Sequence, residues 1–387
     1  MPETALYDFE PTLRLMLAGL CIALGPLAWV WLRGRSAAMA HRLRSLTLLT
    51  LFLTFDLVIF GAFTRLSDSG LGCPDWPGCY GSASPLGARD EIAQAQAALP
   101  TGPVTHGKAW IEMVHRYLAT AVGVLILTLA LATAWAARRR ENTDALPLSP
   151  LWPMLTLLWV CLQGAFGALT VTMKLFPAIV TLHLLGGMGL LALLQVQASR
   201  YTLAGGHSKI VWLPVGVRRL LLMAFLLLWL QIALGAWVST NYAVLACSEF
   251  PACQGSYWPA MDFRQGFTLW RELGASGDGG HIGFAALTAI HYAHRLAAYA
   301  VMLVLLVLAG VLAREPDSRP YGHAVLALVA WQFLSGLSNV VLGWPLVAAL
   351  AHTGGAAALV IVLSATICQS RSAPSAAPRP LSSVPLA

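Results

Sequence analysis

Residues 61–81, GAFTRLSDSGLGCPDWPGCYG, align without a gap on residues 235–255, GAWVSTNYAVLACSEFPACQG. The two copies share a Gly-Ala pair, a leucine, two cysteines, a proline and a closing glycine. After each copy comes a His-Arg pair, and later a histidine closely followed by Gly-Gly. These motifs are His115-Arg116 with His183, and His294-Arg295 with His352. A duplicated unit with loop cysteines and histidines in apolar segments indicates a metal or haem protein.

The composition is typical of a helical membrane protein. Hydrophobic residues make up 58% of the chain and charged residues 11%, whereas a soluble globular chain carries about 25% charged residues. The apolar runs are continuous and do not alternate, which argues against a transmembrane β-barrel. A span needs about 20 apolar residues, and nine segments are long enough: 12–33, 46–66, 111–136, 151–171, 178–198, 219–239, 287–312, 321–342 and 346–368. We therefore expect an all-α polytopic membrane protein.

The basic residues indicate how these spans are oriented. They cluster in alternate connections, at 33–44, 138–140, 209–219 and 314–319, and in the C-terminal tail. Because positive residues stay on the cytoplasmic side, we expect the N-terminus and both cysteine loops outside and the C-terminus in the cytoplasm. The net charge of +7 then reflects topology, and no nucleic-acid partner is expected. The acidic N-terminus is the reverse of a secretory signal, so we predict a bacterial plasma (inner) membrane.

The repeat divides the chain into four regions. Residues 1–45 form an extra N-terminal transmembrane helix and a basic cytoplasmic loop, residues 46–200 a first four-helix repeat, and residues 201–368 a second one. The Ser/Pro/Ala-rich residues 369–387 are expected to be a disordered tail. Each repeat has an even number of spans, so the two are predicted to be parallel, related by an axis along the membrane normal.

Four histidines form the candidate site. His115, His183, His294 and His352 each lie a few residues into a different predicted helix that starts at the outer face, and so at similar depth. A lone intramembrane histidine is usually a hydrogen-bonded packing residue, but two pairs at equivalent places favour ligands. Facing imidazoles with apolar walls suit bis-histidine haem ligation, and the Gly-Gly motifs would admit a flat macrocycle or a neighbouring helix. Zinc is less favoured, because no compact Cys/His spacing lies within the membrane.

Glu112 distinguishes the two halves. Its i,i+3 spacing places it on the same helical face as His115. A carboxyl group at the edge of an apolar pocket can handle protons, whereas the alternative is an interfacial acid that marks the start of a helix. The equivalent position in the second half is His291. The two sites should therefore differ chemically, with the first the more reactive, and His291 could compete with His294 for iron.

The remaining polar residues have simpler interpretations. Two loop disulfides are expected as structural staples, Cys73 with Cys79 and Cys247 with Cys253. Packing roles are predicted for Cys21, Cys161 and Cys368. Asp56 lies well inside the second span and should be a paired or functional acid of unassigned role. Arg116 and Arg295 either reach haem propionates or snorkel to the interface.

In combination, these motifs resemble the heme A synthases. The resemblance rests on GAFTRLSDSGLGCPDWPGC, EMVHR at 112–116, TLHLLGG at 181–187, HYAHR at 291–295 and AHTGG at 351–355. It implies two four-helix halves, each with a bis-histidine haem site near the outer face; the extra first helix departs from the eight-span core. The implied reaction is oxidation of the C8 methyl group of haem O to a formyl group, which makes haem A for cytochrome oxidase.

The resemblance also implies residue roles and partners. His294 and His352 would hold a haem b cofactor, His115 and His183 the substrate haem O, and Glu112 would lie near the reacting edge. A membrane farnesyltransferase (haem O synthase) would supply haem O, and an external donor the electrons, since the sequence carries no flavin or nicotinamide motif. A homo-oligomer is left open. The alternatives are a diheme electron-transfer cytochrome and a haem carrier or assembly factor without oxidation chemistry.

Overall fold

The computed structural model describes residues 10–139, 148–205, 210–277 and 279–372. Within them, nine helices are long and apolar enough to cross a membrane. They are α1 (Glu10–Arg33), α2 (Met39–Leu66), α4 (His106–Arg138), α5 (Leu151–Thr172), α6 (Pro177–Ala204), α7 (Val215–Thr240), α9 (Phe284–Leu312), α10 (Arg319–Val341) and α11 (Leu346–Gln369). The described part of the chain is thus mainly helical, with nine helices able to cross a membrane, in agreement with the predicted all-α polytopic fold.

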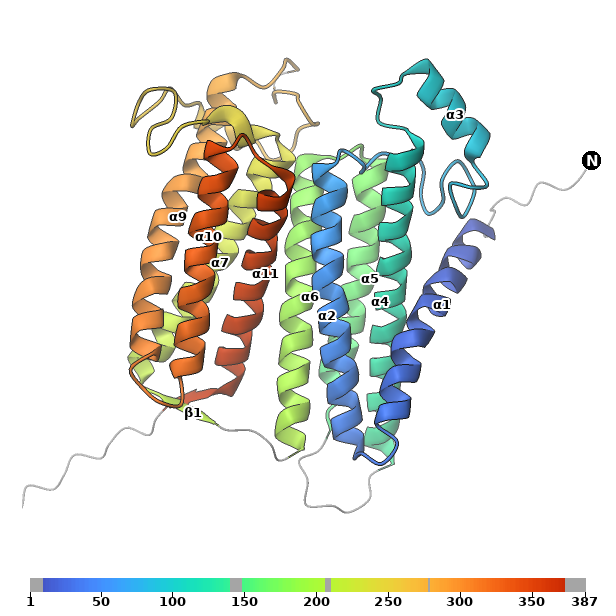
Figure 1. The fold of residues 1–387 in the computed structure, drawn as a ribbon, viewed down its shortest axis with the longest axis vertical. Helices are drawn as coiled ribbons and strands as arrows, with labels where there is room; N and C mark the ends of the chain where they lie inside the picture. The colour runs from blue at the N-terminus through green and yellow to red at the C-terminus, as the bar shows by residue number, and fades with distance from the viewer. Residues whose placement is uncertain (1–9, 140–147, 206–209, 278, 373–387) are drawn as a thin grey trace, which may run out of the picture.

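The helices form two groups that lie side by side (Figure 1). The first group contains α2, α4, α5 and α6, and the second contains α7, α9, α10 and α11. Helices α6 and α2 contact α11 between the groups, and one apolar core runs through both, with Leu125, Leu191, Leu308 and Leu363 fully buried. Helix α1 lies outside both groups and packs mainly on α4.

Both disulfide loops lie at one end of the molecule, the upper end in Figure 1. The first loop follows α2 and contains the Cys73–Cys79 disulfide and helix α3 (Arg89–Ala98). The second follows α7 and contains the 3₁₀ helix η1 (Ala243–Ala246), the Cys247–Cys253 disulfide and helix α8 (Phe263–Gly266). Both predicted disulfides are confirmed. The sequence interpretation treated these stretches as loop and did not anticipate the three short helices.

At the same end, α2 and α7 are joined by a polar junction. Arg65 donates to the hydroxyl of Tyr242 (2.6 Å) and to the carbonyl of Ser239 (2.9 Å), and its guanidinium lies 4.0 Å from the Tyr242 ring centroid. The Tyr242 hydroxyl in turn donates to Asp68 (2.7 Å). This junction ties the two helix groups together where α2 and α7 end.

At the opposite end, the chain after α11 is ordered further than predicted. Ser370–Ser372 form strand β2, which pairs in parallel with β1 (Val211–Leu213). Because these backbone groups are paired, the predicted disordered tail cannot begin at residue 369. Its remainder, residues 373–387, lies outside the described part of the chain.

Helix α4 begins five residues before the predicted start at residue 111. Thr105 caps it, because the Thr105 side chain accepts from the backbone N–H of Lys108 (3.3 Å). Glu112 therefore lies in the second turn and is buried. The interpretation of Glu112 as an interfacial acid that marks the helix start is wrong.

Candidate functional site

The second helix group brings the side chains of His294 of α9 and His352 of α11 close together. Their ring centroids are 6.5 Å apart and the ring planes are nearly perpendicular, at 83°. A metal held at ~2 Å from one nitrogen of each imidazole requires centroids about 6 Å apart. The pair therefore fits the ligation of one iron between the two rings.

In the first group, His115 of α4 and His183 of α6 stand at the matching places of the repeat. Phe60 of α2 lies parallel to the His115 ring at 6.2 Å between centroids and forms an apolar wall. Nδ1 of both histidines is buried and has no hydrogen-bond partner among the described residues. A haem iron would bind Nε2 of each ring, so these Nδ1 atoms would remain without a partner.

Two of the rings lie against the glycine that opens each copy of the duplicated stretch. A Cβ placed on Gly61 would lie 3.0 Å from Cε1 of His115, and one on Gly235 would lie 2.9 Å from Cε1 of His294. Any side chain at these positions would push the imidazole aside. The Gly-Ala pair of the repeat is thus explained by the space that the ring needs.

The other two rings lie against glycines that the sequence interpretation missed. A Cβ on Gly167 would lie 3.4 Å from Cε1 of His183, and one on Gly336 would lie 3.2 Å from Cε1 of His352. Each glycine precedes its histidine by the same interval in the two halves. That matched spacing is the signal that could have identified them.

The Gly-Gly motifs serve helix packing. A Cβ on Gly186 would overlap the amide of Gln163, and one on Gly355 would lie 2.5 Å from Nε2 of Gln332. These glycines let α5 and α10 approach α6 and α11. Of the two predicted roles, the structure supports close approach of a neighbouring helix.

In the second group, two further polar residues contact the histidines. The amide nitrogen of Gln231, on α7, lies 3.0 Å from Nδ1 of His294, and the hydroxyl of Ser335, on α10, lies 3.0 Å from Nδ1 of His352. Sequence analysis missed both residues, although an amide and a hydroxyl within apolar spans were the available signal.

Glu112 lies at the base of the first disulfide loop. Its carboxylate accepts from the backbone N–H of Cys73 (2.8 Å) and forms a buried ion pair with Arg116 (2.5 Å). Arg116 also donates to the carbonyls of Asp75 (3.0 Å) and Pro77 (3.1 Å). Arg116 is only 8% exposed, so it does not snorkel. The pair holds the loop above the first histidine site.

In the second group, His291 and Arg295 hold the other loop. Nδ1 of His291 is bonded to the carbonyl of Ala243 (3.0 Å), and Arg295 donates through Nη1 to Ala252 (2.9 Å). His291 is therefore bonded to the loop, while His294 faces the opposite ring. Nη2 of Arg295 is buried without a partner among the described residues.

Three other predictions are corrected by the orientation of side chains. Asp56 is exposed on the outer surface of α2 and has no side-chain partner within the described part of the chain, so it neither faces the bundle nor forms a pair there. Cys21 and Cys161 are also exposed and are not packing residues, whereas Cys368 is half-buried. The rotation of each helix about its own axis decides which of these side chains are exposed. The nearly uniform hydrophobicity of the spans does not reveal that rotation.

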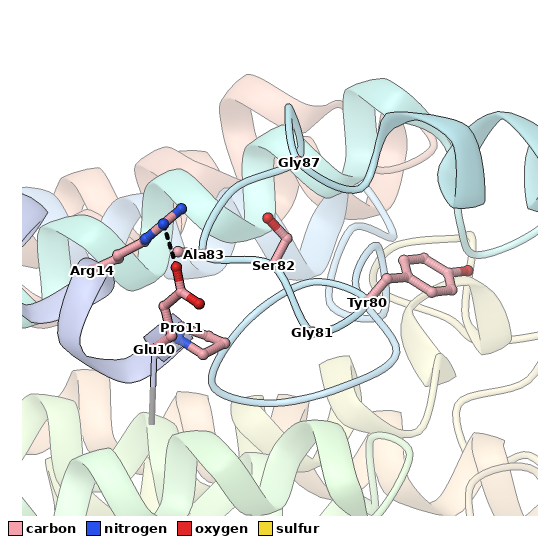
Figure 2. A pocket seen from close by; sticks show the side chains of 8 residues that line it. All are labelled: Glu10, Pro11, Arg14, Tyr80, Gly81, Ser82, Ala83 and Gly87. Carbon is pink, nitrogen blue, oxygen red and sulfur yellow. Dashed lines mark ion pairs between the residues drawn. The ribbon is translucent and has the colours of Figure 1, made fainter. Parts of the chain in front are cut away.

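A cavity of about 280 Å³ lies between the start of α1 and the first disulfide loop (Figure 2). Glu10 and Arg14 of α1 form an ion pair on one side, and Tyr80 and Ser82 of the loop lie on the other. The cavity contains none of the four histidines. Beside it, Leu15 of α1 belongs to the same buried cluster as Cys73 and Cys79, so the extra helix packs on the disulfide loop.

Comparison with known proteins extends over most of the chain. The family described as cytochrome oxidase assembly protein matches residues 44–364. A protein named heme A synthase from Shewanella oneidensis is 37% identical over 318 residues, which cover 81% of this chain and 92% of that protein.

Two further relatives carry the same name. A heme A synthase from Methylobacterium sp. (strain 4-46) is 30% identical and covers 85% of this chain and 92% of its own length. One from Halalkalibacterium halodurans is 25% identical and covers 84% of this chain and 95% of its own. The matched region includes all four histidines, both disulfides and Glu112.

Proposed function

The chain belongs to the cytochrome oxidase assembly protein family, and on that premise we propose that it is a heme A synthase. It is then a haem-dependent oxidoreductase that oxidises the C8 methyl group of haem O to a formyl group, giving haem A. The observation that carries the proposal is the close pair of His294 and His352 in the second helix group, together with His115 and His183 at the matching places of the first.

The second group is assigned to a retained haem b. His294 and His352 would be its axial ligands, supported by the 6.5 Å between their ring centroids. The buried Nη2 of Arg295 is a donor available for a carboxylate of the cofactor. When bound, the haem supplies a redox-active iron; the apolar walls of the site exclude water from it.

The first group is assigned to the substrate haem O, held by His115 and His183. Glu112 is on the His115 face of α4, one turn earlier, and only this group has an acid there. Each carboxylate oxygen has two acceptor sites, so Glu112 can hold Cys73 and Arg116 and still accept or return a proton at the substrate edge. Arg116 already uses both Nη atoms, so a propionate contact is assigned to Arg295 alone.

The membrane arrangement is part of the same proposal. Residues 46–200 and 201–368 are two parallel repeats with both disulfide loops on the outer side. Haem O arrives from a membrane farnesyltransferase, and electrons from an external donor. These roles follow from the reaction, which consumes haem O and needs a source of electrons.

The test is extraction of haem from the purified full-length protein, co-expressed with a supply of haem O, followed by mass analysis. We expect haem A, or a hydroxylated haem O, beside haem b. His115→Ala should abolish both products while haem b is retained; His323→Ala, at an exposed histidine of α10, is the matched control. Haem b alone would favour a diheme cytochrome, and unaltered haem O would favour a carrier.

A further inference from the structure

We propose that Gln231 and Ser335 are positioning residues that hold the second-group histidines as oriented ligands of a retained haem. At the corresponding positions the first group has Leu57 and Phe166, which leave its rings free to release their haem. The inference rests on the proposed function, because it explains how one haem stays while the other is exchanged.

The hydroxyl of Ser335 determines which nitrogen of His352 carries the proton. Ser335 Oγ lies 2.7 Å from the backbone carbonyl of Trp331, to which it donates its only proton. Toward Nδ1 of His352, at 3.0 Å, the hydroxyl can then only accept. Nδ1 must therefore carry the hydrogen, and the lone pair of the neutral imidazole lies on Nε2. That is the tautomer that an iron ligand needs.

Gln231 holds the ring of His294 in place. Its Nε2 donates to the backbone carbonyl of His294 (3.2 Å) and lies 3.0 Å from Nδ1 and 3.4 Å from Nε2 of the ring. Exchange of its amide oxygen and nitrogen would let Oε1 accept from Nδ1 but would break the bond to the carbonyl and leave two oxygens 3.2 Å apart. Gln231 therefore positions the ring, and the contact of Ser335 is the one that fixes a tautomer.

The first group has a side chain without a hydrogen-bonding group at each corresponding place. Leu57 precedes its ring-facing glycine by four residues, as Gln231 does, and Phe166 precedes its glycine by one residue, as Ser335 does. Neither a leucine nor a phenylalanine can accept from an imidazole. This agrees with the buried, unpartnered Nδ1 atoms of the first group.

The difference has a functional consequence. A hydrogen bond at Nδ1 fixes the tautomer and orientation of a ligating imidazole and makes it a stronger donor to the metal; loss of such a partner typically costs about 10–100-fold in metal affinity. A cofactor that remains through many turnovers benefits from that bond. A substrate haem that must leave after oxidation benefits from its absence.

The experiment measures the transfer of haem b from the full-length protein in detergent to excess apomyoglobin. We expect Gln231→Leu and Ser335→Ala to speed this transfer by about 10–100-fold, and Ser338→Ala, at a half-buried serine one turn later on α10, to leave it unchanged. The midpoint potential of haem b should rise, because a weaker imidazole donor stabilises the ferric iron less. Ser335→Thr, which restores the hydroxyl, should reverse both effects.

The reciprocal variant Leu57→Gln tests the first group, where it should slow the release of haem. The positioning proposal is overturned if Gln231→Leu and Ser335→Ala, folded by circular dichroism, keep the haem b transfer rate and midpoint potential of the parent protein. If the parent makes no haem A while these two readouts shift as expected, the positioning role stands and the proposed enzymatic function fails.

Discussion

The two helix groups place their histidines alike but surround them differently. In the second group, Gln231 contacts the ring of His294 and Ser335 contacts the ring of His352. In the described part of the first group, Nδ1 of His115 and Nδ1 of His183 have no hydrogen-bond partner. On the proposed function, the second group would be the cofactor site and the first group the substrate site. The comparison then teaches that the residues around the histidines, and not the histidines themselves, distinguish the two sites.

The contrast is reversed at the opposite end of the bundle. There the first group contains a buried polar network: Tyr201 bonds to Thr133 (2.6 Å), and Gln197 bonds to Tyr201 (3.3 Å), Thr156 (3.3 Å) and Thr47 (3.5 Å). Each of the four helices contributes at least one member. The network is directional, so it fixes the relative rotation of these helices.

The second group replaces the three threonines of this network with aliphatic side chains. Leu221, Leu312 and Val325 stand where the first group has Thr47, Thr133 and Thr156, and all are completely buried. Thr366 and Ser370 stand where the first group has Gln197 and Tyr201. The hydrogen-bonded contacts among the four helices of the first group are therefore replaced in part by apolar packing in the second.

The largest expected difference between the groups is in haem retention. His352→Ala should remove one ligand of haem b and lower its retention by at least ~100-fold, more than loss of a supporting hydrogen bond does. His183→Ala should leave haem b in place and abolish haem A formation. Pyridine haemochrome analysis of the two purified variants measures the first effect, and mass analysis of extracted haem the second. Equal loss of haem b from both would contradict the assignment.

A second contrast concerns Glu112, the acid that only the first group has. Glu112→Ala should lower the rate of haem A formation by about 10²–10⁴-fold if the carboxylate moves protons. Glu112→Gln should be as slow but better folded, because an amide oxygen can still accept from Cys73. Glu315→Gln, at an exposed acid, is the control. A Gln variant that works at the parent rate would limit Glu112 to holding the loop.

The ring-facing glycines should respond alike in the two groups. Gly61→Ala and Gly235→Ala each force a Cβ to about 3 Å from an imidazole carbon, so we expect a loss of about 1–3 kcal/mol in stability and an altered haem absorption spectrum. Gly123→Ala on α4 and Gly310→Ala on α9 have open space and serve as controls. Thermal unfolding in detergent compares the four variants. Stability losses no larger than those of the controls would mean that the rings can shift freely.

A smaller effect is expected from the polar network. Tyr201→Phe removes the hydroxyl that Thr133 and Gln197 share and should cost about 0.5–1.5 kcal/mol. Tyr321→Phe on α10 is the comparison in the second group, because it also removes a hydroxyl bonded to an amide side chain. Tyr321 is only half-buried, so the loss of unfolding free energy should be smaller. The measurement is again the free energy of unfolding. A Tyr201 variant as stable as the parent would make the network dispensable.

The smallest effect is a pH dependence of the junction between the groups. Burial raises the pKa of the Tyr242 phenol above its ordinary value of about 10, although Arg65 acts in the opposite direction. A raised pKa in the folded protein means that the contribution is complete below pH ~10 and is lost as the pH rises through the folded-state pKa. Melting temperatures should fall more steeply above pH ~10 in the parent than in Tyr242→Phe; parallel curves would contradict this.

The sequence was sufficient for the features that depend on long runs or on repeated spacing. Nine spans follow from run length, the disulfides from the matched cysteine spacing, and the histidine pairs from their recurrence. The ends of the ordered segments were harder to predict from the sequence. Strand β2 at Ser370–Ser372 depends on pairing with a strand more than 150 residues earlier, and no local sequence pattern reveals such a pairing.

What the sequence could not provide is the rotation of each helix and the partners of buried charges. Asp56 was predicted to be a paired or functional acid, yet its side chain is exposed. The prediction failed because α2 has apolar residues on all sides, so the sequence does not show which side of the helix faces the bundle. Arg116 looked like a propionate or interface residue, yet its bonds go to carbonyls of a loop some 40 residues earlier. Ser335 was missed although a hydroxyl within an apolar span was a signal, because only the tertiary structure places it against an imidazole.

The junction between α2 and α7 uses a freedom that a single chain has and a symmetric dimer lacks. Arg65 and Ser239 occupy equivalent positions in the two halves, as do Asp68 and Tyr242, and these four residues meet one another. In a dimer of identical subunits, residues on the twofold axis contact their own copies, so an arginine there would face an arginine. In this chain the equivalent positions differ, so Arg65 meets a serine carbonyl and Asp68 meets a tyrosine hydroxyl.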